Sequence, residues 1–211
     1  MSQFAKPSGF FGRFLARGMA WGHRDFYKNA AKVLDLHKSD SFLEIGFGSG
    51  LFIKKYASDA FMIRGLDCSE DMVGLAGDIN KGLVRSERAE FVLGDVSSMP
   101  WEDGTFSAVA AIETFFFWKD PKTALEEIYR VMRPDGRLII EMGYNKDDGQ
   151  DHTSHVKKFG IRLYSGDEMK KMLSGAGFVD VNITYYKGAW MPIKGHLVNM
   201  GMIVKAIKPL D

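Results

Sequence analysis

The chain has 211 residues, and 45% of them are hydrophobic. This length allows one well-buried core but is too short for two ordinary domains with a cleft between them. Its 28 basic and 27 acidic side chains give a formal net charge of +1, so no overall field would recruit nucleic acid. The single cysteine excludes an intrachain disulfide. The sequence has no N-terminal apolar segment and no run of roughly eighteen apolar residues, so it predicts a cytoplasmic protein that is neither secreted nor membrane-spanning.

Residues 1–40 are expected to form an N-terminal helical cap. They are rich in Phe, Gly and basic side chains, and the stretch from Arg24 to Leu36 is predicted to be a helix beside the first strand. Within residues 10–17, phenylalanines are interleaved with arginines, a pattern that would also suit peripheral contact with a membrane surface. A solvated basic face is the favoured interpretation, and interfacial binding is the alternative.

From residue 41 onward, apolar runs of strand length alternate with longer helix-periodic segments. Such alternation indicates an α/β fold in which a mostly parallel, doubly wound sheet carries helices on both faces. Residues 41–143 are expected to form its ligand-binding core. The strands predicted there are Ser41–Ile45, Phe61–Leu66, Glu90–Leu93, Phe106–Ile112 and Arg137–Met142.

Two connections in the second half of the chain carry clear signals. A helix is predicted to begin at Asp120-Pro121, with proline at its first position, and to end in the turn Arg133–Gly136. Residues 144–164 are polar and long for a connection, so we expect a substrate-side loop of the kind that is either a lid or disordered.

Residues 165–211 are expected to form a C-terminal helix and a strand hairpin. Ser165 and Glu168 have the spacing of a capping box, which predicts that a helix starts there. The runs Val179–Tyr186 and Val198–Ile207 then follow with only a short connection between them. Two strands joined in this way would pair antiparallel.

The most informative stretch is Glu44-Ile45-Gly46-Phe47-Gly48-Ser49-Gly50, which follows the first predicted strand. Its glycines would let the backbone approach a ligand closely in a strand-to-helix turn. Leu51 stands where a dinucleotide-binding motif needs its third glycine, and the Glu44 carboxylate would repel phosphate. A dehydrogenase is therefore the least expected function, and a nucleoside carrying a positive centre is the favoured ligand.

Acidic residues follow the first three predicted strands, at Glu44, Asp67 and Asp95. The carboxyl ends of parallel strands meet at one edge of a sheet, where ligands bind in such folds. A carboxylate after the second strand can accept hydrogen bonds from both ribose hydroxyls, and one after the third can accept from an adenine amino group. Helix capping is the alternative role for both aspartates, but it does not explain their shared position.

These features resemble the class I S-adenosylmethionine-dependent methyltransferases, most closely the type 11 branch similar to ubiquinone/menaquinone-biosynthesis methyltransferases. The family has a Rossmann-like, seven-stranded sheet whose last strand is antiparallel, so the resemblance implies one methyltransferase domain over residues 1–211 with a cofactor-binding core at 41–143. It also implies S-adenosyl-L-methionine as cofactor and S-adenosyl-L-homocysteine as product. The stretches that carry the resemblance are Leu43–Gly50, Gly65–Met72, Gly94-Asp95, Pro100–Ser107, Asp120-Pro121, Glu127 and Arg130–Leu138.

The resemblance assigns expected roles to the cofactor-binding residues. The glycines would pass the methionine and ribose parts of the cofactor, with Glu44 near its amino group and Asp67 at the ribose diol. Cys68, Ser69 and Met72 would flank the adenine, and Asp95 and Val96 would hold its edge. Ile112 and Glu113, after the fourth strand, would line the methionine side. The implied set is Glu44, Gly46, Gly48, Gly50, Asp67, Cys68, Ser69, Met72, Asp95, Val96, Ile112 and Glu113.

The chain departs from the family after the fourth strand, where Phe116 and Phe117 occupy positions that often hold histidine. Losing those imidazoles removes a candidate general base, and the aromatic run that replaces them could favour a sulfonium or pack an apolar substrate. The remaining candidate bases are His23, His152 and His155, with Glu113 a weaker option. Candidate substrate contacts are Trp21, Tyr27, Phe116, Phe117, Trp118 and Tyr144.

We therefore expect in-line methyl transfer to a small, apolar or aromatic acceptor, in a monomer or homodimer that needs no metal. Alignment of acceptor, methyl carbon and sulfur would supply much of the acceleration. One alternative is a regulatory protein that binds the cofactor without transfer activity. Another is a nucleic-acid or protein methyltransferase, for which a basic surface or a polar motif after the fourth strand would be expected.

Overall fold

The computed structural model describes residues 24–188 and 199–210, so Trp21, His23 and the segment 10–17 lie outside the described residues. A π-helical turn, Ile53–Ala57, follows the first strand, and a 3-10 turn, Phe115–Phe117, follows the fourth. The remaining elements are α2 (Arg24–Leu34), β1 (Ser41–Ile45), β2 (Met62–Asp67), α3 (Glu70–Ile79), α4 (Lys81–Arg85), β3 (Ala89–Leu93), β4 (Phe106–Ile112), α5 (Pro121–Val131), β5 (Met132–Met142), α6 (Thr153–Phe159), α7 (Gly166–Gly175), β6 (Val179–Gly188) and β7 (Asn199–Ile207).

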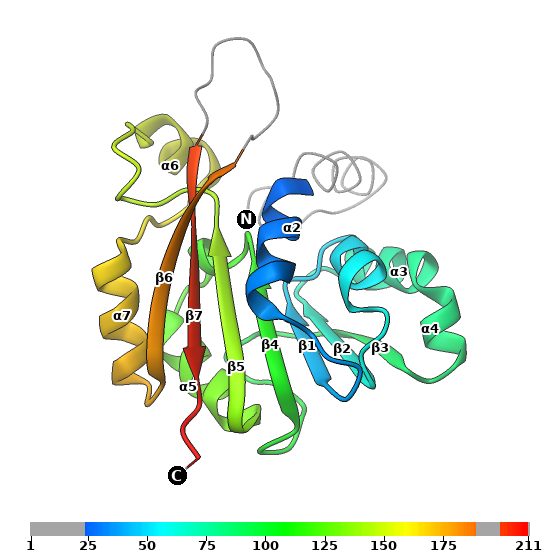
Figure 1. Ribbon diagram of the computed structural model, residues 1–211. Helices are drawn as coiled ribbons and strands as arrows, with labels where there is room; N and C mark the ends of the chain where they lie inside the picture. The colour runs from blue at the N-terminus through cyan, green and yellow to red at the C-terminus, as the bar shows by residue number, and fades with distance from the viewer. Residues whose placement is uncertain (1–23, 189–198, 211) are drawn as a thin grey trace.

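The strands form one seven-stranded sheet in the order β3-β2-β1-β4-β5-β7-β6 (Figure 1). Strands β1 to β5 are parallel, whereas β7 runs antiparallel to both β5 and β6. This confirms the predicted doubly wound sheet, the terminal hairpin and the antiparallel last strand. The chain order reverses between β1 and β4, and the crevice beyond the carboxyl ends of these strands is where such sheets bind ligands.

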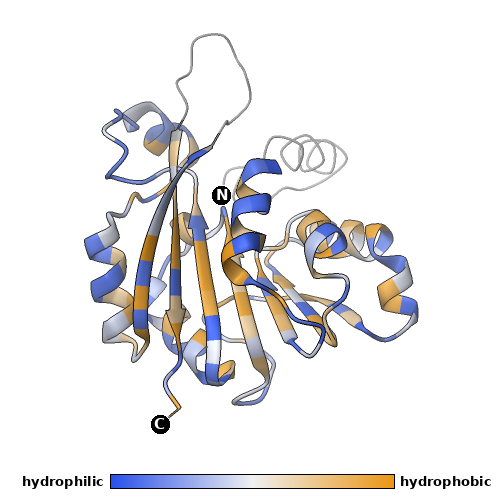
Figure 2. Cartoon of the chain, in the orientation of Figure 1, coloured by the Kyte–Doolittle hydropathy of each residue, from blue (hydrophilic) through white to orange (hydrophobic). Residues whose placement is uncertain are grey.

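Helices cover both faces of the sheet and bury its apolar side chains. On one face α2 and α3 contribute Ala30, Leu34, Met72 and Leu75 to a core that includes Phe42 of β1. On the other face α5 and α7 contribute Leu125, Ile128, Met169 and Leu173. Figure 2 shows the hydrophobic strands between helices whose outer sides are hydrophilic, which is the pattern expected of a three-layer fold.

Helix α2 is fastened to the sheet by a buried ion pair at its carboxyl end. The Arg137 guanidinium on β5 donates to both carboxylate oxygens of Asp40, and also to the carbonyl oxygens of Leu34 at 2.6 Å and Asp35 at 2.8 Å. Burial alone would raise the pKa of Asp40, but hydrogen bonds from Arg137, the His37 backbone and Ser107 lower it. One side chain thus satisfies the last carbonyls of the helix and holds them against β5.

The boundary between α5 and β5 differs from the prediction. Helix α5 ends at Val131, and the predicted turn Arg133–Gly136 belongs to a longer β5 that starts at Met132. The predicted turn is present as a bulge within this strand, because Asp135 has φ of +59° and the pairing with β4 shifts from Phe106/Met132 to Ala108/Arg137. The sequence did not show that the bulge also pairs with the chain end: Asp135 N donates to Lys208 O, and Lys208 N donates to Gly136 O, both at 2.9 Å.

The substrate-side loop, residues 144–164, contains the helix α6, which its polar composition did not indicate. Within it, His152 Nε2 lies 2.7 Å from Asp148 Oδ2, and both side chains are buried. Lys146 N also donates to Tyr164 O at 3.0 Å, which closes the loop at its base. The loop therefore has its own internal contacts in the described structure.

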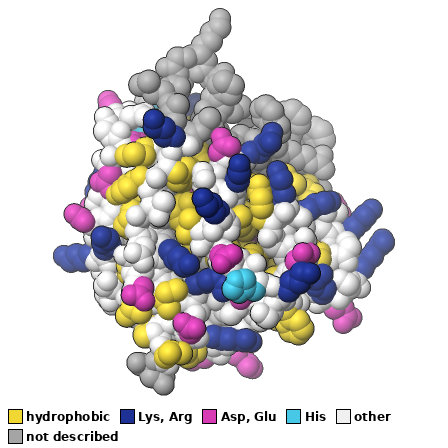
Figure 3. Space-filling model, viewed as in Figure 1, with side chains coloured by type: hydrophobic (Ala, Val, Ile, Leu, Met, Phe, Trp, Pro, Cys, Tyr) yellow, Lys and Arg dark blue, Asp and Glu magenta, His cyan; other side chains and the backbone are white. Residues whose placement is uncertain are grey.

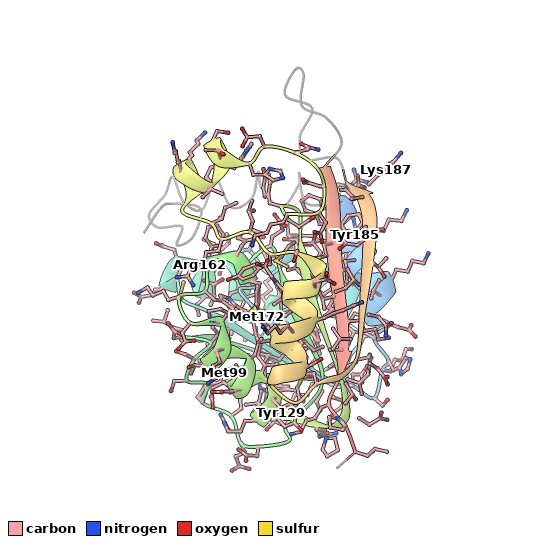
Figure 4. The ribbon with its side chains drawn as sticks, turned by 90° about the vertical axis from the view of Figure 1, so that its left-hand side faces the viewer. Met99, Tyr129, Arg162, Met172, Tyr185 and Lys187 are labelled. Atoms are coloured by element: carbon pink, nitrogen blue, oxygen red, sulfur yellow. The ribbon has the colours of Figure 1, made fainter. Side chains whose placement is uncertain are left out.

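The start of α7 follows the predicted capping box. Ser165 Oγ accepts from Glu168 N at 3.2 Å, and Glu168 Oε2 accepts from Ser165 N at 2.8 Å. Asp147 joins this end to β6, because its Oδ2 accepts from Gly166 N at 2.7 Å and from the Tyr185 hydroxyl at 2.5 Å. Figure 4 shows Met172 on α7 and Tyr185 on the neighbouring β6, near the end of the sheet where α6 lies.

The face of the molecule in Figure 3 has no single block of charge of one sign. Lysines and arginines are spread over it among acidic and hydrophobic side chains. Among the described helices, none has the length and apolar character needed to cross a membrane.

Candidate functional site

The turn after β1 is built around three glycines in the left-handed region, with φ of +71° at Gly46, +52° at Gly48 and +72° at Gly50. A Cβ at Gly46 would clash with the Thr114 side chain, and one at Gly50 would lie 2.8 Å from Asn80 Nδ2. At Gly48 a Cβ would meet nothing within 4 Å. The turn is therefore closely packed on two sides and open at its middle glycine.

Asp67, the last residue of β2, holds this turn in place. Its Oδ2 accepts from Gly48 N at 2.9 Å, and its Oδ1 accepts from Ser69 N at 2.9 Å. The carboxylate is 8% exposed. Since each carboxylate oxygen has two lone pairs, Asp67 can fix the glycine turn and still accept from a ligand hydroxyl.

The neighbouring candidates lie along the ends of β2 and β3. Ser69 is buried before α3, Met72 is fully buried in its first turn, and Cys68 and Val96 are half-buried. Asp95 is exposed just beyond β3, and its Oδ1 accepts from both the backbone and the hydroxyl of Ser97, which lowers its pKa. The structure therefore gathers these predicted residues at the same edge as Asp67.

Glu44, near the carboxyl end of β1, is almost fully buried, at 2% exposure. Burial, followed by the nearby charge of Asp67, raises its pKa well above the usual value. Its Oε2 has no hydrogen-bond partner among the described residues. A buried carboxylate oxygen without a donor is costly, so this atom is suited to receive a donor from a ligand.

A second acidic pair lies after β4 and near the end of β5. The Glu113 backbone has φ of +55°, and its side-chain Oε1 accepts from Gly143 N, while Glu113 N donates to Glu141 O at 3.0 Å. Glu141 is fully buried, its Oε1 accepts from the Tyr186 hydroxyl, and its Oε2 has no partner among the described residues. Two carboxyl groups thus meet at adjacent strand ends.

Burial is the main cause of the raised pKa values in this pair. It raises the pKa of Glu113 to about 7, and burial together with the Glu113 charge raises that of Glu141 well above its usual range. The tyrosines that face these acids, Tyr27 of α2, Tyr144 and Tyr186, have pKa values raised first by burial and then by the acidic groups. The tyrosines therefore remain protonated donors at neutral pH.

We expect Glu113 to make the ligand-free protein less stable as the pH rises. Its folded-state pKa of about 7 exceeds the ordinary value of 4.5, so the folded state holds the proton more tightly. This stabilisation is complete below the ordinary pKa and is lost as the pH rises through the folded one, by roughly 3 kcal/mol in the free energy of unfolding. Denaturant unfolding from about pH 5 to about pH 8.5 measures the loss.

The Glu113→Gln variant is the control for this prediction, because it keeps every other titrating group. These groups include Glu44, Glu141 and the three facing tyrosines, so the difference between the two pH curves reports Glu113 together with its effect on the pKa of Glu141. Relative to the variant, the wild-type protein should lose stability with rising pH. A difference that does not change with pH would contradict the prediction.

The aromatic run after β4 is mostly part of the core. Phe116 and Trp118 are 4% and 8% exposed and pack with the face that α5 and α7 cover, whereas Phe117 is half-buried. Ile112 is buried at the end of β4, and Tyr144 is buried just after β5. Tyr27 is half-buried, with its ring 5.7 Å from that of Phe52. Among these candidates, Tyr27 and Phe117 keep the most exposed surface.

The two described histidine candidates form an aromatic cluster with Tyr144. The Tyr144 ring lies 5.3 Å from that of His152 and 5.0 Å from that of His155. His152 is 4% exposed and its Nε2 is engaged with Asp148, which leaves Nδ1 as its other polar atom. In the described part of the chain no three His, Cys, Asp or Glu residues are grouped to hold a metal ion.

Several residues at this edge were not among the sequence candidates. Asn80 Nδ2 donates to Gly50 O at 3.1 Å, and nothing in the local sequence relates these two positions. Tyr186 lies 45 residues from Glu141, to which it donates. Glu141 itself had a signal, because it is a charged residue inside the apolar run Leu138–Met142.

Comparison with known proteins finds methyltransferases. Residues 43–140 match the family model described as a methyltransferase domain. The chain is 26% identical over 155 residues to the uncharacterized methyltransferase YdaC of Bacillus subtilis, covering 72% of this chain and 78% of that protein. It is 27% identical over 159 residues to phosphoethanolamine N-methyltransferase 1 of Triticum aestivum, covering 73% of this chain but 31% of that protein.

The fold matches a chain in the solved complex of the Haloferax volcanii Trm112 methyltransferase activator with a methyltransferase. The TM-score is 0.76 at 21% sequence identity, over 92% of this chain and 93% of that one. The matched segment, residues 43–140, contains the glycine turn, Glu44, Asp67, Asp95 and Glu113, and ends just before Glu141. Over residues 43–140 the chain matches a methyltransferase domain, and its relatives and structural neighbours support a class I methyltransferase that uses S-adenosylmethionine as cofactor.

Proposed function

We propose that this enzyme methylates a small molecule with an apolar or aromatic part, and that the glycine turn with Glu44 and Asp67 holds the cofactor. One observation carries the proposal: at the carboxyl ends of β1 and β2, an open Gly48 stands beside two buried carboxylates, one of which has an oxygen with no donor among the described residues. Bound S-adenosylmethionine supplies a methyl group on an electron-poor sulfur. Transfer of this methyl group depends on its alignment with the acceptor more than on a metal.

The residues near Gly48 fit the cofactor's polar groups. Each carboxylate oxygen can accept more than one hydrogen bond, so Asp67 can hold its two backbone amides and also accept from the ribose hydroxyls. No described residue donates a hydrogen bond to Glu44 Oε2, so this atom suits the cationic amino group of the methionine part. Binding that cation would offset the cost of burying the Glu44 carboxylate. We assign the adenine to the edge formed by Cys68, Ser69, Met72, Asp95 and Val96.

The acceptor side lies beyond β4 and β5, next to the methionine end. Ile112 and Glu113 would line the cofactor there, and the half-buried rings of Tyr27 and Phe117 offer apolar surface to a small acceptor. Phe116, Trp118 and Tyr144 would support this surface from the core. A catalytic role for His152 or His155 stays a prediction, and the wheat relative's name shows that a small amine is an acceptor elsewhere among the relatives.

Alanine at Gly48 is expected to block cofactor binding with little effect on folding. The position has open space for a Cβ, so the stability cost is that of the left-handed backbone, roughly 1–2 kcal/mol. The added methyl would occupy the surface that we assign to the cofactor. Titration calorimetry with S-adenosylhomocysteine should show binding at least roughly tenfold weaker than that of the wild-type protein.

Alanine at Gly46 is the matched comparison, because the same change there meets the Thr114 side chain. This variant should lose more stability than Gly48→Ala in thermal unfolding, since it adds a clash to the same backbone strain. Unchanged affinity in a folded Gly48→Ala variant would contradict the assignment of the turn to the cofactor.

The proposed function is tested by following S-adenosylhomocysteine formation with three kinds of acceptor. These are a panel of phenols, quinols and amines, a total RNA preparation, and a mixture of denatured proteins. Product with small molecules alone supports the proposal. Product with RNA or protein alone would favour a macromolecular methyltransferase, and cofactor binding without product in any arm would favour a regulatory protein.

A further inference from the structure

Three glutamates have no cationic partner among the described residues: the buried Glu44 and Glu141 and the half-buried Glu113. Burial raises the pKa of each, and no lysine, arginine or histidine of the described segments contributes to the shift. Asp67 accepts from two backbone amides, and three other poorly exposed acids are each paired with a cation. Asp40 is paired with Arg137, Glu127 with Arg130, and Asp148 with His152.

The pair Glu113 and Glu141 is separate from Glu44. In the sheet register Glu44 lies opposite Ala110 of β4, whereas Glu141 lies opposite Ile112. Two strand spacings and two residue steps therefore separate Glu44 from Glu141, or roughly 11–12 Å between Cα atoms. The charge of Glu44 also does not contribute to the pKa shift of Glu113 or Glu141, so we treat the two places as separate positions for positive charge.

Aromatic rings from two elements, α2 and β6, lie around the pair. The Tyr186 hydroxyl of β6 donates to Glu141, and the Tyr186 ring lies 6.2 Å from that of Phe26 in α2. A Cβ at Gly143 would lie 2.9 Å from Glu113 Oε1 and 3.0 Å from Phe26 Cζ, so the Phe26 ring closes over this acid. In Figure 1 the first turns of α2 lie over the ends of β4 and β5, consistent with this enclosure.

We propose that Glu113 and Glu141, with Phe26, Tyr27 and Tyr186 around them, bind the ammonium group of an amine acceptor, and that Glu113 takes its proton before methyl transfer. The inference rests on the proposed function, because it places the acceptor beside the methionine end of the cofactor. Buried carboxylates with an aromatic surround match a primary or secondary ammonium in both charge and hydrogen bonding.

The chemistry balances with the groups named. The ammonium R–NH₃⁺ gives one proton to the Glu113 carboxylate, which leaves R–NH₂ and a neutral carboxylic acid. The nitrogen lone pair then forms the new N–C bond as the C–S bond breaks, and the electron pair of that bond goes to sulfur. The product R–NH₂⁺–CH₃ is again a cation, and the proton on Glu113 passes to solvent.

An ammonium fits the pair better than a metal ion or a shared proton does. A metal ion would need a third ligand, and among the described residues no group of three His, Cys, Asp or Glu is suitable. A pair that merely shares one proton would keep a net negative charge and leave the second oxygen of Glu141 without a donor, as it is in the described structure. An ammonium supplies donors to both acids at once.

The test measures binding, by calorimetry on protein saturated with S-adenosylhomocysteine at about pH 8, where these acids are more ionised. Three amines are compared with neutral alcohols of the same shape: phenethylamine with phenethyl alcohol, tyramine with tyrosol, and ethanolamine with ethylene glycol. Where a pair binds, the amine should bind roughly tenfold to a hundredfold more tightly than its alcohol. Protein that binds S-adenosylhomocysteine but prefers no amine over its alcohol overturns the inference.

Matched variants locate the site. Glu141→Gln keeps the side-chain shape and should remove most of the amine preference while leaving S-adenosylhomocysteine binding within roughly threefold of wild type. Glu113→Gln should also remove most of the amine preference, with some loss of S-adenosylhomocysteine affinity because Glu113 would also line the cofactor. Glu44→Gln should weaken S-adenosylhomocysteine binding and leave the amine preference unchanged. Glu126→Gln, on the exposed side of α5, should change neither S-adenosylhomocysteine binding nor the amine preference. Amine preference that survives both Glu113→Gln and Glu141→Gln would overturn the assignment. Failure of the wild-type protein to bind S-adenosylhomocysteine would instead overturn the proposed function.

Discussion

Alanine in place of Asp67 should weaken S-adenosylhomocysteine binding by roughly a hundredfold or more, the largest loss of affinity expected from any single change in this site. The substitution removes two sets of hydrogen bonds at once. The amides of Gly48 and Ser69 lose their acceptor, so the glycine turn is no longer held, and the ribose hydroxyls that we assign to this acid lose theirs as well. Titration calorimetry measures the affinity directly.

Two comparisons make this result interpretable. Asp59→Ala changes an exposed acid in the turn before β2 and should leave the affinity unchanged. Asp67→Asn keeps one oxygen and the side-chain volume, so its affinity should fall between those of alanine and wild type. If Asp67→Ala folds and binds the cofactor as tightly as the wild-type protein, the assignment of the ribose to Asp67 is wrong.

Methionine in place of Arg137 is expected to cost roughly 3–5 kcal/mol in the free energy of unfolding, the largest effect on stability predicted here. The change leaves Asp40, which is 4% exposed, as a buried carboxylate without its cation. It also removes the donors to the carbonyls of Leu34 and Asp35, so α2 loses its attachment to β5. Denaturant unfolding at neutral pH gives the value.

A second substitution separates charge from packing. In the double variant Asp40→Leu with Arg137→Met the unpaired charge is gone, so a large part of the lost stability should return. The control Arg85→Met alters an exposed arginine on α4 and should change stability by no more than about 0.5 kcal/mol. A single Arg137→Met variant as stable as the control would show that the buried pair contributes nothing.

The parts of this protein that the sequence predicted well are those whose cause is local. The strands are short apolar runs, the capping box of α7 needs only Ser165 and Glu168, and the glycine turn is contiguous. The acids at Glu44 and Asp67 could be placed at one edge because parallel strands share that edge. Family resemblance then gave the cofactor, since its motifs lie within the same continuous segment.

What the sequence did not predict depends on partners that lie far away in the chain. The bulged start of β5 pairs with the chain end, because Asp135 and Gly136 bond to Lys208. Helix α6 has polar composition, and its stability involves a buried pair, Asp148 and His152, that composition does not reveal. The pairing of Glu113 with Glu141 requires knowing which strands are neighbours and at which register, so periodicity alone could not find it.

The position of β7 between β5 and β6 has a consequence for synthesis on the ribosome. The parallel strands β1 to β5 can pair as they emerge, but β6 has no neighbour in the sheet except β7, which is made after it. Until residues 199–207 leave the ribosome, one edge of β5 and both edges of β6 are unpaired, so a nascent chain paused there exposes strand edges that can pair with other chains. Stalling within this short interval should therefore make the nascent protein depend on chaperones more than stalling at any earlier strand.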